Sequence, residues 1–421
     1  MAPHDLRRPF KRPAISDQQR RREASLRRQD ENREEVKRRA RSLVSTVLSF
    51  QAEPKSPSND QELELQCEEI LVETESSSPR DTFDVRHASK LRGPEARQWF
   101  SKQLMLPEWM IDVPDNLNTD WYVFARPAGQ RCFVVSSNGT TVSRLRNGTM
   151  LHRFPSALPG GARGASRSGQ SYCILDCIFH ELDQTYYVID VVCWAGMLLY
   201  ECTADFRLFW LNSRLDEAGA CAAPSTYHRY RFSTVPVYNC DLEGLRTAYS
   251  GALPYVKDGL LFYNKYAHYQ TGNTPLALVW KDEKCSQYVI DTDSRGQVPS
   301  QQQVVLELLD DGRLATSDDP PVIFGCLNKD FIQETGLQSG ILLRFAVNNN
   351  GLEFVDGKLE RADLQYLGKV NRARLFADSY SKVVFQYTVR HSPLRIEELF
   401  ASIGSFGEDG TVTRDVEMVG E

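Results

Sequence analysis

Residues 258–281, DGLLFYNKYAHYQTGNTPLALVWK, predict two neighbouring strands joined by a turn. The first strand is the apolar and aromatic run 260–263, and the second is the apolar run 276–280, which ends at Lys281. Between them, residues 270–273 have the polar, glycine-containing composition of a turn. Short apolar runs of this kind are typical of buried strands, so we expect this unit to lie at the centre of the fold.

The composition describes an acidic body that carries a basic arm. The chain has 421 residues and is 41% hydrophobic, which is enough for a sizeable core and more than one domain. Residues 1–50 contain 14 Lys and Arg against 7 Asp and Glu. Because the net charge of the whole chain is -6, the other residues together carry -13. A basic arm on an acidic body indicates that the arm has a partner of its own.

Several classes of protein are disfavoured by the sequence. The ten cysteines are scattered without paired CxxC units, which indicates free thiols in a reducing compartment, and we expect no metal and no cofactor. No apolar run approaches the roughly 18 residues of a membrane span, so we expect no membrane partner. The N-terminus lacks the apolar core of a secretory signal. We therefore expect the protein in the nucleus and the cytoplasm.

The basic arm, residues 1–50, predicts a long charged helix. A capping box from Ser16 to Gln19 marks its start, and no Gly or Pro follows as far as Phe50. Because its apolar residues are few, we expect that it does not pack on the body of the protein. Three alternatives are open: a solvated or disordered segment, a helix that orders against an acidic partner, or a basic RNA-binding arm.

The rest of the chain divides by composition into a linker, two domains and a tail. Residues 51–91 form an acidic linker of disordered composition, and 404–421 form a tail of the same kind. Residues 92–297 and 298–403 form the two domains. Their many short apolar runs and few helices predict an α+β fold with antiparallel sheets, the second domain being β-rich.

The elements we expect follow from these runs. In the first domain we predict a helix over 99–109, a helix starting near 206, a hairpin turn at Asn138-Gly139, and strands at 121–125, 131–135, 140–143, 172–176 and 186–192. In the second domain we predict a turn over 348–351 and strands at 304–308, 340–345 and 382–387.

The central unit resembles two motifs of the covalent nucleotidyltransferases, the mRNA capping enzymes and DNA ligases. Those enzymes use a lysine nucleophile in a K-x-D-G-x-R motif, and the matching segment here reads Arg126-Pro-Ala-Gly-Gln-Arg131. Arg126 stands where the nucleophile is expected, and a guanidinium stays protonated and cannot attack a phosphate. The pattern also has Ala128 in place of an Asp and Ile178 in place of a Glu. These departures indicate a binding fold that is not an enzyme.

Longer segments are similar to the snurportin family of nuclear import adaptors. The similarity runs from Gln103 to Trp280 and is carried by the segments 103–114, 153–161, 175–178, 184–188, 193–194, 258–263 and 274–276. The arm resembles the importin-β-binding domain of the same family. The resemblance implies a nucleotidyltransferase-like cap-binding domain. The C-terminal β-rich domain extends beyond the similarity and stands where capping enzymes have an OB domain, so we expect it to be OB-like.

The resemblance also implies the ligand, the trimethylguanosine cap of spliceosomal small nuclear RNA. Methylation leaves this base cationic and removes hydrogen-bond donors, so stacking and phosphate contacts suit it best. Trp280 matches the family's stacking tryptophan, and Trp109 the one beside the methylated edge. The full set implied for the cap is Leu106, Pro107, Trp109, Arg126, Arg131, Arg146, Ile178 and Trp280.

For importin-β the resemblance implies a set of arm residues: Phe10, Lys11, Arg12, Arg20, Arg21, Arg22, Arg27, Arg28, Arg38 and Arg39. An exportin is a further expected partner, for recycling, although the apolar segment that precedes the arm in animal relatives is not seen. Two rival functions stay open. An active guanylyltransferase or ligase would need Lys281 or Lys265 as a displaced nucleophile, and a general RNA-binding protein would bind through the arm with strong salt dependence.

Overall fold

The computed structural model describes residues 17–31, 41–43, 93–162, 171–293, 295–355, 358–371 and 374–404. The predicted linker 51–91 lies outside these residues, as does the tail after Gly404. In the part of the chain that is described, no helix has the length and apolar character needed to cross a membrane.

The hairpin predicted over 258–281 forms the centre of the first sheet. The sheet has the order β1-β12-β11-β2-β10, with β1 (Met105–Trp109), β12 (Gly272–Trp280), β11 (Lys257–Asn264), β2 (Trp121–Pro127) and β10 (Tyr238–Asn239). Leu260 pairs with Trp280 across β11 and β12, and with Ala125 across β11 and β2. The predicted strands and their antiparallel pairing are therefore confirmed.

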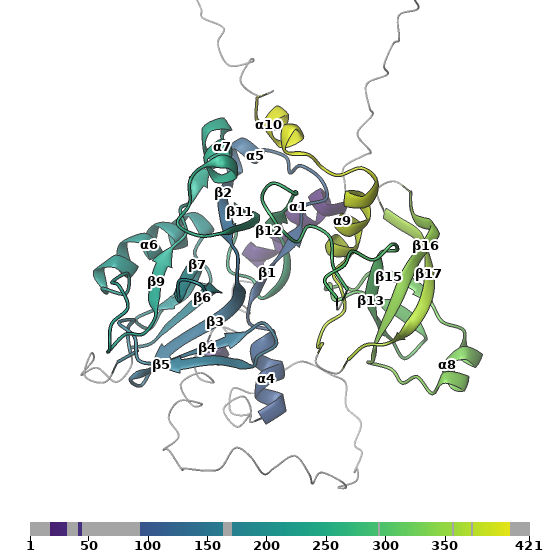
Figure 1. Cartoon of the computed structure of the whole chain (residues 1–421), viewed down its shortest axis with the longest axis horizontal. Helices are drawn as coiled ribbons and strands as arrows, with labels where there is room; N and C mark the ends of the chain where they lie inside the picture. The colour runs from purple at the N-terminus through teal and green to yellow at the C-terminus, as the bar shows by residue number, and fades with distance from the viewer. Residues whose placement is uncertain are drawn as a thin grey trace, which may run out of the picture.

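A second, seven-stranded sheet packs in the same half of the molecule (Figure 1). Its strands are β5 (Met150–Phe154), β4 (Thr140–Leu145), β3 (Gln130–Ser137), β6 (Cys173–His180), β7 (Thr185–Trp194), β8 (Met197–Leu198) and β9 (Arg231–Thr234). The turn between β3 and β4 has positive φ at Asn138 (49°) and Gly139 (77°), as the predicted Asn-Gly hairpin requires. Strands β6 and β7 are buried along their whole length, which explains their continuous apolar sequence.

Within the described residues 93–162 and 171–293, four helices accompany these two sheets: α4 (Gly93–Ser101), α5 (Leu117–Asp120), α6 (Ala204–Glu217) and α7 (Leu242–Ser250). Helix α6 begins where the sequence predicts a helix, and the Thr203 hydroxyl caps it by accepting a hydrogen bond from the Phe206 amide at 3.4 Å.

The predicted helix over 99–109 is wrong. Helix α4 ends at Ser101, and residues 105–109 form β1, which pairs in parallel with β12. The edge position of β1 explains how a strand can contain Pro107, because an edge strand leaves one row of backbone groups without a ladder partner. The register shifts between Pro107 and Glu108, next to the proline.

The C-terminal domain contains a third sheet with the order β15-β14-β13-β16-β17. Its elements are β13 (Gln303–Leu308), β14 (Arg313–Ala315), β15 (Ile323–Cys326), α8 (Lys329–Thr335), β16 (Leu342–Val355) and β17 (Lys358–Lys369). The outer strands β15 and β17 also contact each other. Five antiparallel strands confirm that the C-terminal domain is β-rich, and the OB-like form stays a prediction. The predicted turn over 348–351 is wrong, because these residues lie within β16, where the register shifts between Val347 and Leu352.

The predicted strand over 382–387 is also wrong, because these residues lie in helix α9 (Tyr380–His391). Tyr380, Val383, Val384 and Tyr387 follow the i, i+3, i+4, i+7 spacing of a helix and pack on the core of the third sheet. The β-branched valines favour a strand locally, and this tertiary contact overrides that preference. The last helix, α10 (Ile396–Gly404), packs instead on the core of the first sheet through Ile396, Leu399 and Ile403.

Helix α1 (Asp17–Glu31) packs on the body, which corrects the expectation that the arm does not. Figure 1 shows it between the β1–β12 edge of the first sheet and α9. Gln18, Arg22 and Gln29 are buried there, and Leu43, farther along the arm, is only 1% exposed in the core of the first sheet. The expectation failed because it counted apolar residues, whereas α1 docks through polar side chains.

Candidate functional site

The two predicted cap tryptophans lie on opposite faces of the first sheet. Trp109 is the register partner of Val279, and Trp280 is the next residue along β12. Because side chains alternate along a strand, Val279 and Trp280 point to opposite faces. Lys281, two residues after Val279, has its Nζ 5.8 Å from the Trp109 ring. Trp109 and Lys281 therefore share one face, and Trp280 shares the other with Leu260.

Trp280 is fully buried in the first core. Its exposed fraction is 0%, its ring centroid is 6.1 Å from that of Tyr249 on α7, and its Nε1 donates a hydrogen bond to the Leu394 carbonyl at 3.0 Å. In this conformation no base can stack on it. The role that the resemblance implies for Trp280 stays a prediction, and it requires the segment at Leu394 to move.

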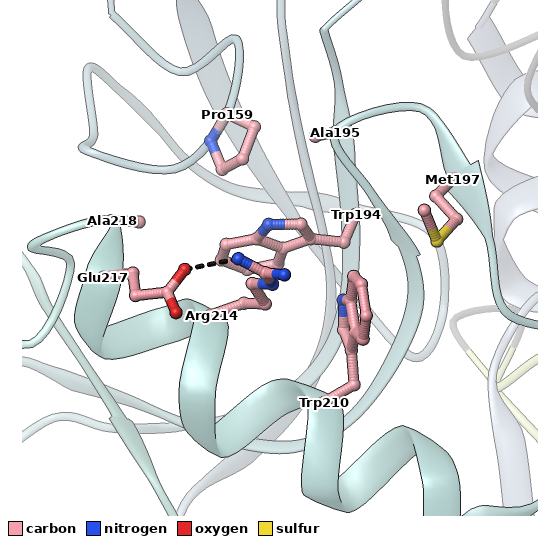
Figure 2. Close-up of a pocket in the computed structure, with 8 residues that line it drawn as sticks. All are labelled: Pro159, Trp194, Ala195, Met197, Trp210, Arg214, Glu217 and Ala218. Carbon is pink, nitrogen blue, oxygen red and sulfur yellow. Dashed lines mark hydrogen bonds and ion pairs between the residues drawn. The ribbon is translucent and has the colours of Figure 1, made fainter.

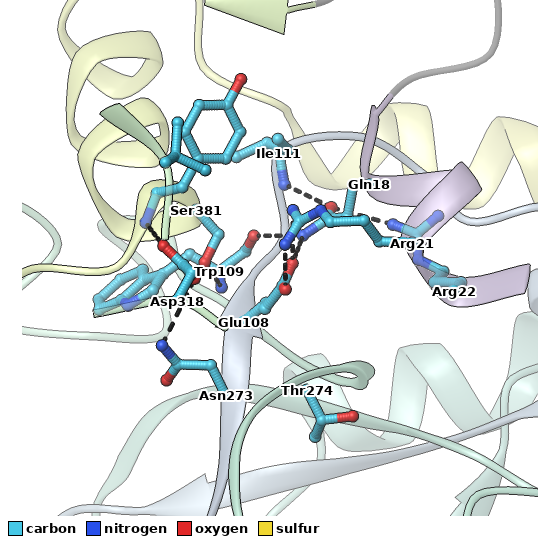
Figure 3. Close-up of polar contacts among 12 residues, drawn as sticks. Gln18, Arg21, Arg22, Glu108, Trp109, Ile111, Asn273, Thr274, Asp318 and Ser381 are labelled. Atoms are coloured by element: carbon cyan, nitrogen blue, oxygen red, sulfur yellow. Dashed lines mark hydrogen bonds and ion pairs between the residues drawn. The ribbon is translucent and has the colours of Figure 1, made fainter. Parts of the chain in front are cut away.

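Trp109 is half-buried and is held by helix α9. Its backbone N–H donates to the Ser381 Oγ at 3.1 Å, which Figure 3 shows, and its ring centroid is 4.7 Å from that of Phe385 at an interplanar angle of 44°. With the Lys281 ammonium on the same ring, Trp109 is already the centre of a cation–π and aromatic cluster.

Arg126, at the position of the missing nucleophile, forms an ion pair with Asp258. Asp258 also accepts from the Lys281 Nζ and the Ser286 Oγ, each at 2.6 Å. Burial lowers the pKa of Arg126 and that of Lys281, and Asp258 acts in the opposite direction on both. Repulsion from Arg131 adds to the lowering at Arg126, and repulsion from Arg126 adds to it at Lys281. One carboxylate thus serves two cations, which leaves a net positive charge at this point.

Arg131 is committed to the interior. Its Nε and Nη2 each donate to Asp176 at 2.7 Å, and Nη2 also donates to the Met105 carbonyl at 2.7 Å. Burial raises the pKa of Asp176 and Arg131 opposes that shift. Ile178, two residues on in β6, is 0% exposed in the first core. Arg131 and Ile178 therefore lie beneath the surface of the site and support the residues that line it.

A tight turn brings Arg126 and Arg131 together. Gly129 between them has φ of 141°, and a Cβ there would lie 2.2 Å from the Phe179 carbonyl oxygen. Arg146 is exposed, and its guanidinium lies 6.0 Å from the Phe376 ring. Burial lowers the pKa of both Arg126 and Arg146, and repulsion from Arg131 adds to each shift, so both arginines lie within electrostatic reach of Arg131.

The structure therefore brings most of the predicted cap residues together on one surface and leaves Trp280 on the opposite side of the sheet. Leu106 and Pro107, both half-buried, lead along β1 to Trp109. Additional residues that the sequence did not single out as part of this site are Asp258, Phe385 and Arg374, whose Nε donates to the carbonyl of Phe376 beside Arg146 at 3.0 Å. Asp258 follows from the motif DGLLF, whereas the other two are about 100 residues downstream of β12, and no local pattern points to them.

The arm site is described only in part. Phe10, Lys11, Arg12, Arg38 and Arg39 lie outside the described residues. On α1, the Gln18 Nε2 donates to the Glu108 carboxylate at 2.8 Å and to the Trp109 carbonyl at 3.0 Å, and Arg21 pairs with the same carboxylate (Figure 3). The Arg22 guanidinium pairs with Asp112 at 2.8 Å.

The other basic residues of α1 lie on its solvent-exposed side. Arg20, Arg27 and Arg28 are exposed, whereas Gln29 anchors the last turn by accepting from the His268 amide at 2.7 Å. Arg21 and Arg22 therefore face the body, and the three other arginines face solvent.

A separate pocket of about 420 Å³ lies beside α6, and no predicted site residue lines it. In it the Arg214 guanidinium lies 4.6 Å from the Trp210 ring and pairs with Glu217 at 2.5 Å, next to Trp194 (Figure 2). The charge of Arg214 is therefore already paired with a carboxylate of the same helix.

Residues 103–282 match a family model described as Snurportin1, m3G cap-binding domain. The match covers less than half of the 421 residues, and it shows that this region is similar to that domain. The matched region contains all the predicted cap residues and ends before the third sheet, α9 and α10. The third sheet and these two helices therefore lie outside the matched region.

Similar solved structures are DNA ligases. A mycobacterial DNA ligase D complexed with ATP and MES is 11% identical over 65% of this chain and 97% of its own, with a TM-score of 0.31. A Lig E DNA ligase is 16% identical over 63% of this chain and 98% of its own, with a TM-score of 0.27. The ligase domain of M. tuberculosis LigD is 11% identical over 63% and 93%, with a TM-score of 0.29. Similarities of this size carry no conclusion about activity.

Proposed function

We propose that this protein is a nuclear import adaptor that binds the trimethylguanosine cap of small nuclear RNA and links the ribonucleoprotein to importin-β. The observation that carries the proposal is the match of residues 103–282 to the snurportin cap-binding domain, together with the surface formed by Trp109 and its cations. In this proposal the protein shuttles between the cytoplasm and the nucleus, and an exportin recycles it.

The chemistry of the surface suits this ligand. The cationic, methylated base lacks donors for base-edge pairing, so an indole face supplies the main attraction. Arg126 and Arg146 are cations at the same surface, and a polyphosphate is the anion that guanidinium groups bind best.

The test is a calorimetric titration of the full chain with trimethylated and monomethylated cap dinucleotides. We expect binding that favours the trimethylated cap, and Trp109→Ala should weaken it about 10- to 100-fold, because stacking contributes roughly 1–3 kcal/mol per base. Trp210→Phe, on α6 and outside the surface, is the control and should bind normally. No binding by the wild-type chain, or normal binding by Trp109→Ala, would contradict the cap assignment.

The arm supports the second half of the proposal. Its exposed arginines Arg20, Arg27 and Arg28 are available to an acidic partner while α1 stays docked. Arg21 and Arg22 are engaged with Glu108 and Asp112, so a partner that uses the whole helix must first detach it.

Two triple variants separate these groups in a pull-down with purified importin-β. Reversing Arg20, Arg27 and Arg28 to Glu should abolish capture and leave cap affinity unchanged. Reversing the exposed Arg361, Arg313 and Arg395 of the C-terminal half is the matched control. Equal capture of both variants by importin-β would exclude the arm as its ligand.

The enzymatic alternative rests on one observation, the lowered pKa of Lys281. A lysine with a lowered pKa can act as a nucleophile. Against it, the Lys281 Nζ is held by Asp258 at 2.6 Å, and Lys265 is directed elsewhere, 5.0 Å from the Tyr122 ring. We expect no covalent adduct with labelled GTP or ATP and a divalent metal, and an adduct lost in Lys281→Ala would establish the alternative.

A further inference from the structure

The segment Arg374–Phe385 contacts two of the predicted cap residues although it lies about 90 residues beyond the matched domain. At its C-terminal end, Ser381 and Phe385 on α9 hold the backbone and ring of Trp109, at 3.1 Å and 4.7 Å. At its N-terminal end, the Phe376 ring lies 6.0 Å from the Arg146 guanidinium. The segment therefore spans the surface from the tryptophan to the outermost arginine.

A second strip of the C-terminal domain borders the same surface. The side-chain amide of Asn273, next to Leu106 across the β1–β12 pair, lies 3.4 Å from the Ser317 carbonyl and from the Asp318 carboxylate. Asp318 in turn accepts from the Tyr380 amide at the start of α9 at 2.6 Å. These hydrogen bonds hold α9 firmly against β1.

The segment also brings guanidinium groups together around one phenylalanine. The Arg374 Nε donates to the Phe376 carbonyl at 3.0 Å and its Nη2 to Asp378 at 2.7 Å, while Arg146 lies over the ring of the same Phe376. Burial lowers the pKa of Arg146, repulsion from Arg131 and Arg374 adds to this, and Asp378 acts in the opposite direction. Among the residues that the structure describes, no carboxylate forms an ion pair with Arg146. Like charges are thus gathered where a polyanion would relieve their repulsion.

We propose that the segment Arg374–Phe385 forms one wall of the cap site. Arg374, with Arg146 across from it, binds the polyphosphate that joins the methylated base to the RNA, and Phe385 supports Trp109 on the base side. This inference rests on the proposed cap function and extends it, because it assigns a ligand to the C-terminal domain, which the matched family domain lacks.

The proposed phosphate contact of Arg374 is tested with two probes. One is a trimethylated cap dinucleotide with its triphosphate bridge, and the other is the trimethylguanosine nucleoside, which has no phosphate. Arg374→Ala should bind the dinucleotide about tenfold more weakly, with a shallower salt dependence, and the nucleoside normally. Arg361→Ala, on the exposed side of β17, is the matched control and should bind both like the wild type.

Because Arg374 pairs with the buried Asp378, Arg374→Lys serves as a second variant that keeps the charge and loses the planar fork. We expect it to bind the dinucleotide with an affinity between those of the wild type and Arg374→Ala. Wild-type affinity in both Arg374 variants, or an equal loss for dinucleotide and nucleoside, would overturn the phosphate assignment.

The base half is tested with Phe385→Leu, which keeps an apolar side chain and removes the ring against Trp109. It should weaken both probes by a similar factor of about 3 to 10, in contrast to Arg374→Ala. Unchanged nucleoside affinity would overturn this half. If the wild-type chain binds neither probe, the cap function itself fails; if it binds both and neither substitution matters, only the wall assignment fails.

Discussion

At the scale of single residues, the position of a side chain on a strand decides whether it can meet a ligand. Trp280 and Lys281 are neighbours in sequence, yet Lys281 faces Trp109, and Trp280 faces α7 and the segment before α10. The Trp280 indole is a core residue with a satisfied N–H, whereas Trp109 is half-buried beside a cation.

Trp280→Phe should therefore destabilise the protein without weakening cap binding. The phenyl ring fills less of the core and cannot donate to the Leu394 carbonyl, so we expect a loss of about 1–3 kcal/mol in the free energy of unfolding. Urea denaturation measures the loss and calorimetry measures cap affinity. A large drop in affinity at preserved stability would instead restore Trp280 as the stacking residue.

Asp378 is a second residue whose surroundings have a measurable effect, in this case on its pKa. Its carboxylate is 7% exposed, and although burial raises its pKa, attraction by Lys382 and Arg374 and the Val305 amide outweigh that and lower it below 3.8. A lowered pKa means that the native state holds the charged form more firmly than the unfolded chain does. This contribution to stability is present above pH 3.8 and is lost as the pH falls through the lowered value.

Asp378→Asn should consequently cost about 3–5 kcal/mol at pH 7, because it leaves two cations without their shared partner. The difference between mutant and wild type should shrink as the pH falls below about 4. Denaturation curves at a series of pH values provide the measurement, and a pH-independent difference would show that packing, not charge, is responsible.

At the scale of elements, α1 shows that a polar helix can dock firmly. Glu108 is 2% exposed, and Gln18 and Arg21 both donate to it. Its neighbour Trp109 accepts from the same Gln18, so the arm and the cap surface share one segment of β1.

Glu108→Gln should loosen α1 and strengthen binding to importin-β. A hydrogen bond to a charged group contributes roughly 1.5–3 kcal/mol, and a docked arm reduces the apparent affinity for a competing partner by its docked fraction. We expect about a tenfold gain in a titration with importin-β and faster hydrogen exchange over 17–31. Glu360→Gln, an exposed change on β17, is the control. Slower exchange or weaker binding would contradict the competition.

At the scale of the whole molecule, the C-terminal half completes the core of the first. Leu394 covers Trp280, and α10 inserts Ile396, Leu399 and Ile403 into the core of the first sheet. The domain boundary predicted at about residue 297 thus separates the sheets, whereas the core of the first sheet includes side chains from both sides of this boundary.

A chain that ends at residue 297 should therefore fold poorly, even though it contains the complete matched domain. Removing α10 takes three apolar side chains out of the first core and exposes their partners and the indole of Trp280, and this lost burial is worth several kcal/mol at about 25 cal/mol per Å². We expect a fall of at least 10 °C in the thermal midpoint or aggregation on expression. A chain that ends at Gly404 should retain the wild-type midpoint, and equal midpoints for both chains would refute the shared core.

The sequence by itself determined the elements whose signals are local. The runs around Leu261 and Leu278 predicted the central hairpin, Asn138-Gly139 predicted the turn between β3 and β4, and the segments from Gln103 to Trp280 carried the resemblance to the snurportin family. The alternation of side chains along the predicted strand 276–280 also predicts that Trp280 and Lys281 point to opposite faces of the sheet. These features depend on neighbours within a few residues, where periodicity and turn chemistry act.

Only the tertiary structure decided where the arm lies, that 382–387 is a helix, and that Arg374 and Phe385 border the predicted cap surface. Each depends on a partner about 90 or more residues away: Gln18 on Glu108, Phe376 on Arg146, Phe385 on Trp109. The free energy of such contacts comes from burial and from charge pairing across the fold, and a local stretch of sequence carries no record of which distant side chain will supply the other half.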